Sequence, residues 1–313
     1  MGDKNATERL AADAAGIARA AELLAADELV ALPTETVYGL AARADRAEAV
    51  AAVYRAKGRP DFNPLIVHVS SLAAAEGLAV FDDRARSLAA RFWPGPLTLV
   101  LPLRAGAGIA PAVTAGLPTI ALRCPAHPVI RAVLQECGLP LAAPSANRSG
   151  GVSPTSAEHV LAALDGRIAA VIDGGDSECG LESTIVALRE NGWQLLRQGP
   201  ISEETLADQL GAPRPLQATR IEAPGQLAQH YSPGKPVRLG ARAAEPDEFM
   251  IGFGAIAGDC MLSGSGDLPE AASRLYACLH AAASSAKARV AVAPIPDEGI
   301  GAAINDRLRR ASA

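Results

Sequence analysis

Residues 32–68 read LPTETVYGLAARADRAEAVAAVYRAKGRPDFNPLIVH, and their pattern predicts a sheet with helices packed on it. Residues 47–56 show a helical pattern that a glycine and a proline end, and short apolar runs at 28–32 and 65–69 flank it. A strand, a helix and a strand in this order are typical of folds in which helices cover a sheet. We therefore expect an α/β fold.

The same stretch carries more polar groups than a core needs. It contains two hydroxyls, a phenol, two cations, an amide and an imidazole: Thr34, Thr36, Tyr38, Lys57, Arg59, Asn63 and His68. Burying such groups without partners costs a few kcal/mol each, so the mixture favours a site for a polar, anionic ligand. A phosphate would use Lys57 as a point charge and Arg59 as a fork. Two readings without a ligand stay open: both cations could be solvated at a helix end, and His68 could bond to the backbone.

Apolar periodicity predicts further elements along the chain. We expect helices at 10–24, 83–92, 128–136, 156–164 and 202–210, and strands at 97–101, 119–122, 141–143, 169–172, 183–188 and 194–196. The alternation is irregular and the last strands are adjacent, which predicts a mixed twisted sheet with helices on it. Residues 211–236 have the proline-rich composition of a linker. We expect domains at 1–210 and 237–313, the second being a smaller C-terminal α/β unit.

Composition argues against several classes of protein. The formal net charge is -5 and the pI is about 5.6, whereas broad non-specific nucleic-acid binding needs a basic surface. The five cysteines are widely spaced without a CxxC pair, so we expect reduced thiols rather than a disulfide framework or a zinc site. The sequence shows neither a signal-peptide pattern nor about 18 consecutive apolar residues, which predicts a cytoplasmic protein without a membrane span.

The segment TIALR, residues 119–123, places two polar side chains on one face of an expected edge strand. Thr119 and Arg123 share this face because side chains alternate along a strand. Arg123 stands at the strand end before a loop and suits a ligand carboxylate. A surface arginine without a ligand would give the same pattern.

Two later segments also gather polar groups at strand ends. Residues 143–160, APSANRSGGVSPTSAEHV, leave a strand for a loop that offers Ser145, Asn147, Ser149 and Ser153. Such loops bind anions in α/β proteins, although the end of this one could simply cap the next helix. Ser183 begins a strand, and Arg197 on the next strand is expected beside it in a hairpin.

Six segments stand in the order of a known family: PTETVYGL, KGRPDFNPLIVHV, WPGPLTLVLP, TIALRCPAHP, APSANRSGGVSPT and ESTIV. They resemble the YrdC-like family of threonylcarbamoyl-AMP synthases over nearly the whole chain. HYSPGKP at 230–236 and GIGAAINDRL at 299–308 resemble its long, two-domain branch. The resemblance implies a YrdC-like fold and a nucleotidyltransferase. Its reaction joins L-threonine, bicarbonate and ATP, with Mg²⁺, into threonylcarbamoyl-AMP and pyrophosphate, the first step of threonylcarbamoyladenosine formation in tRNA.

The resemblance also implies site residues and partners. Threonine would be held by Thr36, His68, Arg123, Ser183 and the backbone of Ala143. ATP would be held by Arg59, Asn63, Thr119, Ser145, Ser153, Arg197, His230 and Tyr231. Lys57 would be the cation over the reacting phosphates, and the linker at 211–236 would close over the nucleotide as a lid. The product would pass to a separate tRNA-modifying complex; direct tRNA binding and protein ligands for Mg²⁺ are left unassigned.

Two other functions stay open. The first is a related carbamoyl-adenylate former of hydrogenase maturation, whose chains are longer and carry acylphosphatase and zinc-finger parts. The second is an RNA-binding module without catalysis, which the acidic composition disfavours.

The chain also departs from the family pattern: PGQLAQHYSP at 224–233 replaces a basic or Met-containing run, and LLRQG at 195–199 replaces the frequent LLRPG. The first departure could weaken contacts between the lid and phosphate.

Overall fold

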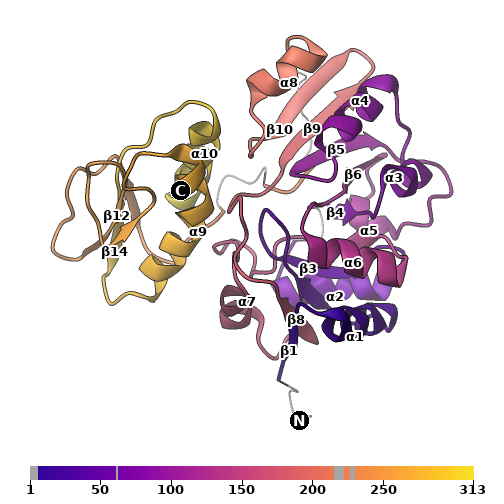
Figure 1. Cartoon of the computed structure of the whole chain (residues 1–313), viewed down its shortest axis with the longest axis horizontal. Helices are drawn as coiled ribbons and strands as arrows, with labels where there is room; N and C mark the ends of the chain where they lie inside the picture. The colour runs from indigo at the N-terminus through magenta and orange to yellow at the C-terminus, as the bar shows by residue number, and fades with distance from the viewer. Residues whose placement is uncertain (1–5, 61–62, 215–221, 226–229) are drawn as a thin grey trace.

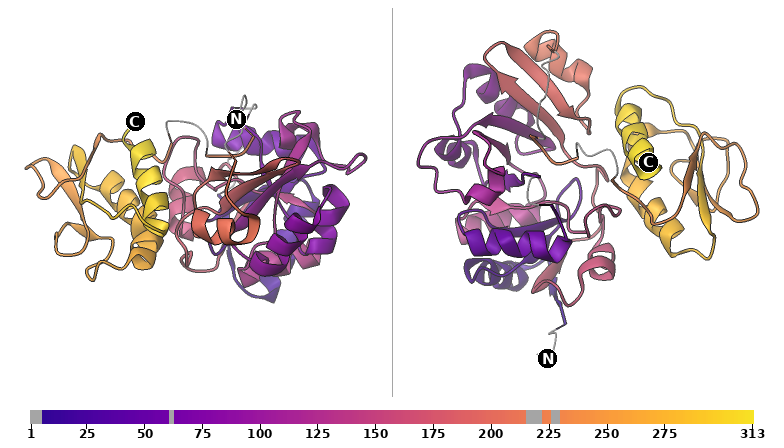
Figure 2. Two further views of the ribbon diagram at one scale, coloured as in Figure 1. Left: turned by 90° about the horizontal axis from the view of Figure 1, so that it is seen from above. Right: turned by 180° about the vertical axis from the view of Figure 1, so that it is seen from behind.

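The computed structural model describes residues 6–60, 63–214, 222–225 and 230–313, which form two lobes of unequal size. Figure 1 shows the larger lobe, coloured from indigo to salmon, beside a smaller C-terminal lobe in orange and yellow. Both views of Figure 2 keep the lobes side by side. The last helix of the larger lobe, α8 (Glu203–Leu210), and the first strand of the smaller one, β11 (Val237–Leu239), are joined by the proline-rich linker.

The larger lobe is built on one ten-stranded sheet. Its strands are β1 (Glu8–Ala11), β2 (Val30–Leu32), β3 (Gly39–Arg43), β4 (Ile66–His68), β5 (Leu97–Pro102), β6 (Thr119–Arg123), β7 (Leu141–Ala142), β8 (Ala170–Asp173), β9 (Thr184–Arg189) and β10 (Gly192–Arg197). They lie in the order β1-β8-β2-β3-β7-β4-β6-β5-β9-β10, with both parallel and antiparallel pairs. The predicted mixed sheet is therefore confirmed.

Helices cover both faces of this sheet. They are α1 (Ala14–Ala25), α2 (Ala47–Lys57), α3 (Leu72–Leu78), α4 (Asp83–Phe92), α5 (Pro111–Thr114), α6 (Pro128–Cys137), α7 (Ala157–Leu164) and α8. Successive strand residues point to opposite layers, as Ala31 and Leu32 show. Ala31 belongs to the main core with residues of α2 and α4, whereas Leu32 packs with residues of α1 and α6.

On the side of α1 and α6, the half of the sheet formed by β4, β6, β5 and β9 is covered differently. Its apolar cluster consists of Ile66, Val100, Ala121, Ile185, Ala187, Leu196 and Ala223. Ala223 comes from the linker, so within the described residues a linker segment rather than a helix covers this half. Polar side chains at the surrounding strand ends can therefore face a common cleft.

The smaller lobe has a four-stranded parallel sheet in the order β11-β14-β12-β13, with β12 (Glu248–Gly252), β13 (Cys260–Met261) and β14 (Arg289–Val292). Its helices are α9 (Leu268–Ser284) and α10 (Ile300–Ala311). Leu181 and Tyr231, which lie outside this lobe in sequence, are buried in its apolar core. The two lobes thus share part of one core.

Two sequence expectations about elements are wrong. The helix expected at 10–24 is a strand followed by a helix: Leu10 pairs with Ile172 in the sheet, and Asp13 begins α1 by accepting a hydrogen bond from the Gly16 amide. Leu10 fits both the helical and the strand period, so the pattern does not show where the strand ends and the helix begins. In addition, β6 is not an edge strand, since β4 and β5 pair with it on either side.

The expectation that all cysteines are reduced is also wrong. Cys260 of β13 and Cys278 of α9 form a disulfide, with Cα atoms 5.8 Å apart. Their spacing of 18 residues matches no motif, because the pairing is created by packing of the helix on the strand. Cys124, Cys137 and Cys179 are free.

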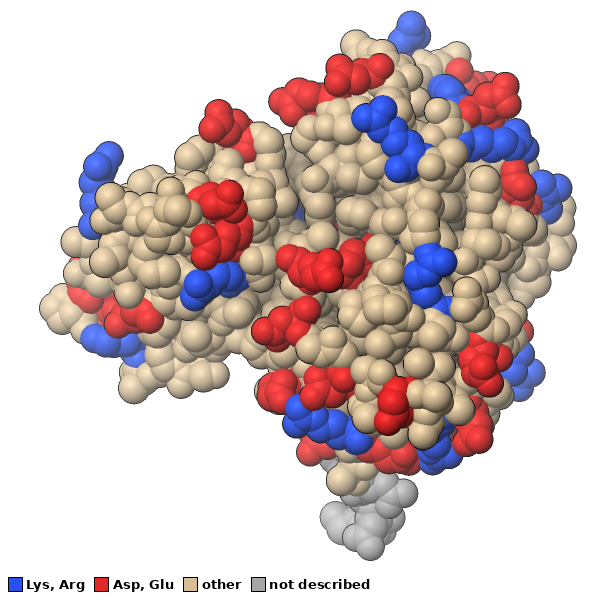
Figure 3. All heavy atoms as spheres, viewed as in Figure 1, with Lys and Arg blue, Asp and Glu red and all other residues tan. Residues whose placement is uncertain are grey.

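The face in Figure 3 carries acidic and basic side chains interspersed with one another. Among the residues that the structure describes, no helix is long and apolar enough to cross a membrane.

Candidate active site

A narrow cleft opens over the half of the sheet that the linker covers. Its walls come from the loop after β2, the ends of β4 and β6, the loop after β7, the β9–β10 hairpin and the linker. Ten of the predicted site residues line it: Thr36, Arg59, His68, Arg123, Ala143, Ser145, Ser183, Arg197, His230 and Tyr231. The other four, Lys57, Asn63, Thr119 and Ser153, do not line this cleft.

Arg123 is held at one end of the cleft by three oxygen atoms. Its Nε donates to the Gly95 carbonyl at 3.2 Å and its Nη1 to Thr36 Oγ1 at 2.8 Å, while Nη2 lies 2.7 Å from a carboxylate oxygen of Glu35. The two hydrogen bonds engage two of the five N–H groups of the guanidinium, and the ion pair with Glu35 helps to hold it in place. N–H groups on both Nη atoms remain for a ligand in a fixed orientation.

Glu35 is a functional residue that the sequence reasoning did not identify. It is buried, and its other oxygen accepts hydrogen bonds from the amides of Ala126 and His127 at 3.1 and 3.4 Å. Burial raises the pKa of Glu35, but Arg123 outweighs this and leaves the pKa below its usual value. The signal was a carboxylate between two threonines in PTETVYGL, whose arginine partner is far away in sequence.

His68 lies beside Arg123 because β4 and β6 are parallel and these two residues are paired in register. Burial, followed by the nearby Arg123 charge, lowers the pKa of His68 to about 3. The imidazole is therefore neutral near pH 7. It can offer one N–H donor and one acceptor to a ligand.

This neutral histidine should make the protein sensitive to acid. In the unfolded chain His68 gains a proton as the pH falls below about 6.5, whereas the folded protein excludes that proton down to about pH 3. Protons therefore favour the unfolded state, and stability falls as the pH falls through this window. Between pH 6 and 4, about 1.4 kcal/mol per pH unit of this loss should come from His68.

Urea unfolding of the wild type and of His68→Gln at several pH values measures this contribution. Other buried histidines titrate in the wild type and in the variant alike. The difference between the two proteins in the slope of unfolding free energy against pH therefore isolates His68. Equal slopes in the two proteins would contradict the assignment.

Arg59 lines the middle of the cleft. Its Nε and Nη2 donate to the carbonyls of Asn63 and Pro64 at 3.3 and 3.0 Å, which folds the guanidinium over the loop before β4. Burial lowers the pKa of Arg59 to about 10, so it stays charged at neutral pH. Asn63 is buried beneath it, and its side-chain Oδ1 has no hydrogen-bond partner among the described residues.

Lys57 lies behind the cleft wall rather than on its lining. Its side chain is buried, and Nζ donates to the carbonyls of Ser145 at 2.6 Å and Asn147 at 2.5 Å. Burial, and after it the charges of Arg59 and Arg148, hold the pKa of Lys57 well below its ordinary value. The lysine thereby fastens the loop after β7 to the end of α2.

The loop after β7 divides into two parts with different roles. Ser145 lines the cleft and forms an isolated antiparallel β-bridge with Gly39. Ser153 is buried and donates to Glu182 Oε1 at 2.6 Å. Ser156 caps α7 by accepting from the His159 amide, so the helix-cap reading is correct for the end of this segment.

Ser183 and Arg197 form the opposite wall, and the predicted β9–β10 hairpin is confirmed. Arg197 Nε donates to the Ser183 carbonyl and Nη2 to Ser183 Oγ, both at 3.0 Å. Ser183 Oγ also lies 2.7 Å from Thr98 Oγ1. Burial lowers the pKa of Arg197. This wall therefore presents an ordered cation and hydroxyl.

The linker closes the cleft from outside. Arg197 Nη1 donates to the Pro224 carbonyl at 3.5 Å, and the Glu222 carboxylate is paired with Arg189 at the end of β9. His230 and Tyr231 also line the cleft, with ring centroids 4.1 Å apart. Burial lowers the pKa of His230 to about 4, so it is neutral near pH 7.

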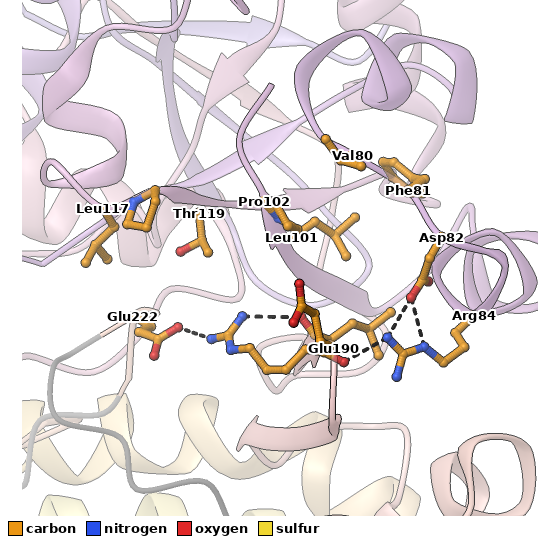
Figure 4. A pocket seen from close by; sticks show the side chains of 13 residues that line it. Val80, Phe81, Asp82, Arg84, Leu101, Pro102, Leu117, Thr119, Glu190 and Glu222 are labelled. Atoms are coloured by element: carbon orange, nitrogen blue, oxygen red, sulfur yellow. Dashed lines mark hydrogen bonds and ion pairs between the residues drawn. The ribbon is translucent and has the colours of Figure 1, made fainter. Parts of the chain in front are cut away.

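Thr119 lies in a second cavity, at the opposite end of β6 from Arg123. This cavity has a volume of about 570 Å³ and is lined by Val80, Phe81, Asp82, Arg84, Leu101, Pro102, Leu117, Pro118, Thr119, Leu188, Arg189, Glu190 and Glu222. Figure 4 shows Thr119 across from Glu222, whose carboxylate is paired with Arg189. Ala223, fully buried, lies on the sheet in the same linker segment.

Comparison with known proteins extends these observations. Residues 22–199 match the Sua5–YciO–YrdC family model, described as telomere recombination, and residues 201–313 match a model described as threonylcarbamoyl-AMP synthase, C-terminal domain. The threonylcarbamoyl-AMP synthase of Bacillus subtilis is 39% identical over 98% of this chain and 95% of its own length. That of Pyrococcus abyssi is 37% identical over 94% and 93%.

A solved structure agrees with the sequence matches. The crystal structure of Pyrococcus abyssi Sua5 complexed with L-threonine is 34% identical and superposes with a TM-score of 0.89. The match covers 98% of this chain and 97% of that one, so it includes both lobes.

Proposed function

We infer that this chain, which belongs to the Sua5–YciO–YrdC family of threonylcarbamoyl-AMP synthases, makes threonylcarbamoyl-AMP from L-threonine, bicarbonate and ATP and releases pyrophosphate. The observation that carries this function is the cleft itself. One end has an oriented guanidinium beside hydroxyls and a neutral imidazole, and Arg59 and Arg197 place two further guanidinium groups on the walls. A small amino acid and a polyphosphate can therefore lie end to end.

The Arg123 end suits threonine. The remaining N–H groups on the two Nη atoms of Arg123 form a fork for the amino-acid carboxylate. Thr36, His68, Ser183 and the backbone of Ala143 surround this position and can bond to the hydroxyl and the amine. Glu35 keeps the guanidinium in place and balances its charge, so the fork is already oriented when threonine arrives.

The phosphates would lie between Arg59 and Arg197, with Ser145 as a hydroxyl donor from the loop after β7. Two guanidinium groups on facing walls of the cleft can neutralise the charge that develops in phosphoryl transfer. Lys57 would act by holding the Ser145 loop, given the position of its amine. Ser153 would act through Glu182 rather than by touching phosphate.

The nucleoside would extend along the sheet toward Asn63 and Thr119. Ala223 covers that path, since it belongs to the same apolar cluster as Ile66 and Ala121. The segment at residues 222–225 must therefore shift when a nucleotide reaches both Arg197 and Thr119. The pairs Arg189–Glu222 and Arg197–Pro224 are the contacts that such a shift would break.

The described residues offer no dedicated magnesium site. None of them form a group of three or more His, Cys, Asp or Glu side chains that could hold a metal ion. Glu182, which lines the cleft, and Glu35, which is paired with Arg123 at its end, each have an arginine partner. Mg²⁺ would accordingly arrive with ATP, bound by phosphate oxygens and water, as this cation usually is.

The chemistry needs positioning more than acid–base groups. The threonine amine has a pKa of about 8 and is partly neutral near pH 7. It forms a carbamate with bicarbonate, releasing water, and the carbamate oxygen attacks the α-phosphorus of ATP as pyrophosphate leaves. Because the carbamate is unstable in water, a linker that closes the cleft protects it. The product would pass to a separate tRNA-modifying complex, and a cytoplasmic location stays a prediction.

Pyrophosphate release tests this function. We expect release from ATP that requires both L-threonine and bicarbonate, with serine and valine much weaker than threonine. Release without any amino acid would favour the carbamoyl-adenylate activity of hydrogenase maturation. An absence of release under all these conditions would contradict the enzyme assignment and favour a binding module.

A further inference from the structure

One buried carboxylate joins the two lobes at the cleft. Glu182, the residue before Ser183, accepts hydrogen bonds from Ser153 Oγ at 2.6 Å, Tyr276 OH at 2.8 Å and Arg307 Nε at 2.9 Å. Tyr276 lies on α9 and Arg307 on α10, and both side chains are fully buried. Two helices of the C-terminal lobe therefore hold a carboxylate that lines the active-site cleft of the other lobe.

The same two residues hold the linker. The Arg307 guanidinium lies 5.3 Å above the centre of the Tyr231 ring, and Tyr276 stacks on that ring with centroids 5.6 Å apart. Arg307 Nη2 also donates to the Gln198 carbonyl at 2.8 Å, next to Arg197 in sequence. Tyr231 is thus fixed by the C-terminal lobe on the side away from the cleft.

The backbone around Gly180 packs closely against helix α9. Gly180 has φ +64°, and a Cβ at this position would lie 2.4 Å from the Ser273 carbonyl oxygen of α9. Only glycine combines this conformation with such a close approach. His280 Nε2, also on α9, lies 3.1 Å from the Ser153 carbonyl oxygen. The segment 180–183 and Ser153 are therefore fixed against α9.

The positive charge of Arg307 also acts on the Glu182 carboxylate. Burial would raise the pKa of Glu182, but Arg307 and Arg197 lower it to about 2, so the carboxylate is ionised at neutral pH. An uncompensated negative charge in this cleft would repel a triphosphate. Arg307 supplies the compensating charge from outside the cleft, which leaves Arg197 available to the phosphates.

We propose that the C-terminal lobe completes the ATP-binding part of the active site, with Arg307 as a positioning residue that acts through Glu182 and Tyr231. This inference rests on the proposed function and assigns the second lobe a role in it. The carboxylate fork at the threonine end depends instead on Glu35 and Arg123, which Arg307 does not contact, and of the proposed threonine ligands only Ser183 adjoins Glu182. We call the contacts of Arg307 and Tyr276 with Glu182 and Tyr231 the relay. Its disruption should therefore weaken ATP binding much more than threonine binding.

Calorimetry with a non-hydrolysable ATP analogue and, separately, with L-threonine tests the proposal on the full chain. Arg307→Met should weaken analogue binding on the order of 100-fold, the range for one partner of a buried charge pair, and change threonine binding by less than about 3-fold. Tyr276→Phe removes one hydroxyl and should weaken analogue binding about 5-fold. The double variant Glu182→Gln/Arg307→Met removes both charges and should recover most of the affinity that Arg307→Met loses.

Arg309→Ala on the same helix is the matched control, because this exposed side chain lies outside the relay, and it should bind both ligands as the wild type does. Analogue affinity in Arg307→Met equal to that in Arg309→Ala, or equal losses for analogue and threonine, would overturn the proposal. If Arg307→Met fails to fold, Tyr276→Phe and the double variant decide, and wild-type analogue affinity in Tyr276→Phe overturns it. Analogue binding does not require turnover, so a wild type that binds ATP but releases no pyrophosphate would contradict the proposed function separately.

Discussion

Replacing Arg123 by methionine should reduce kcat/KM for threonine at least about 100-fold, because the oriented fork that receives the carboxylate is lost. The effect on ATP-analogue binding should stay within a few-fold, since Arg59 and Arg197 line the other part of the cleft. Steady-state assays of pyrophosphate release with varied threonine, together with calorimetry of the analogue, separate the two effects.

The same substitution leaves Glu35 buried without its arginine, which should cost about 3–5 kcal/mol of stability. The double variant Glu35→Gln/Arg123→Met removes both charges and should regain most of that stability, yet it should remain as inactive toward threonine as the single variant. Thermal unfolding and activity measured side by side distinguish these outcomes. Arg91→Ala, at an exposed position on α4, is the control for loss of an arginine. Normal threonine kinetics in a folded Arg123→Met protein would refute the carboxylate assignment.

The sequence predicts the cleft best where polar residues stand at the ends of strands or in their loops. Thr36, His68, Arg123 and Ser145 follow this rule and meet in one cleft. The physical reason is local: a strand end fixes the direction of the chain, and adjacent strand ends lie together. The large sheet and the C-terminal α/β unit are predictable for the same reason, since their periodicity is local.

The sequence could not predict features that depend on contacts between distant segments. Glu35 and Glu182 are visible as residues, but the arginines that hold them ionised come from β6 and α10. The disulfide between Cys260 and Cys278 and the interior position of β6 arise from packing in the same way. Arg307, Arg309 and Arg310 together have the pattern of a solvated basic helix end, yet the structure shows Arg307 fully buried. A pattern of alternating arginines and apolar residues near a chain end does not distinguish the two cases.

Lys57 shows how burial changes the expected result of a mutation. A lysine near a helix end would ordinarily be solvated, and its loss would remove one charge from a ligand. Here Nζ is bonded to two carbonyls of the loop that carries Ser145, and a neutral amine can serve both as well as an ammonium group can. Replacement by methionine keeps the volume but leaves both buried carbonyls without their donor, at about 1–3 kcal/mol each.

Lys57→Met should therefore lower the free energy of unfolding by about 2–6 kcal/mol and also reduce kcat/KM for ATP at least about 100-fold, because the Ser145 loop loses its attachment to α2. Denaturant unfolding and pyrophosphate assays below the unfolding temperature measure the two effects separately. Arg55→Ala, an exposed cation one half-turn earlier on the same helix, should change neither. A Lys57→Met protein that keeps full stability but loses ATP activity would show that the lysine acts by its charge on phosphate, as the sequence alone suggests. Loss of both properties would show that it acts through the loop, because a direct charge on the phosphates need not support the fold.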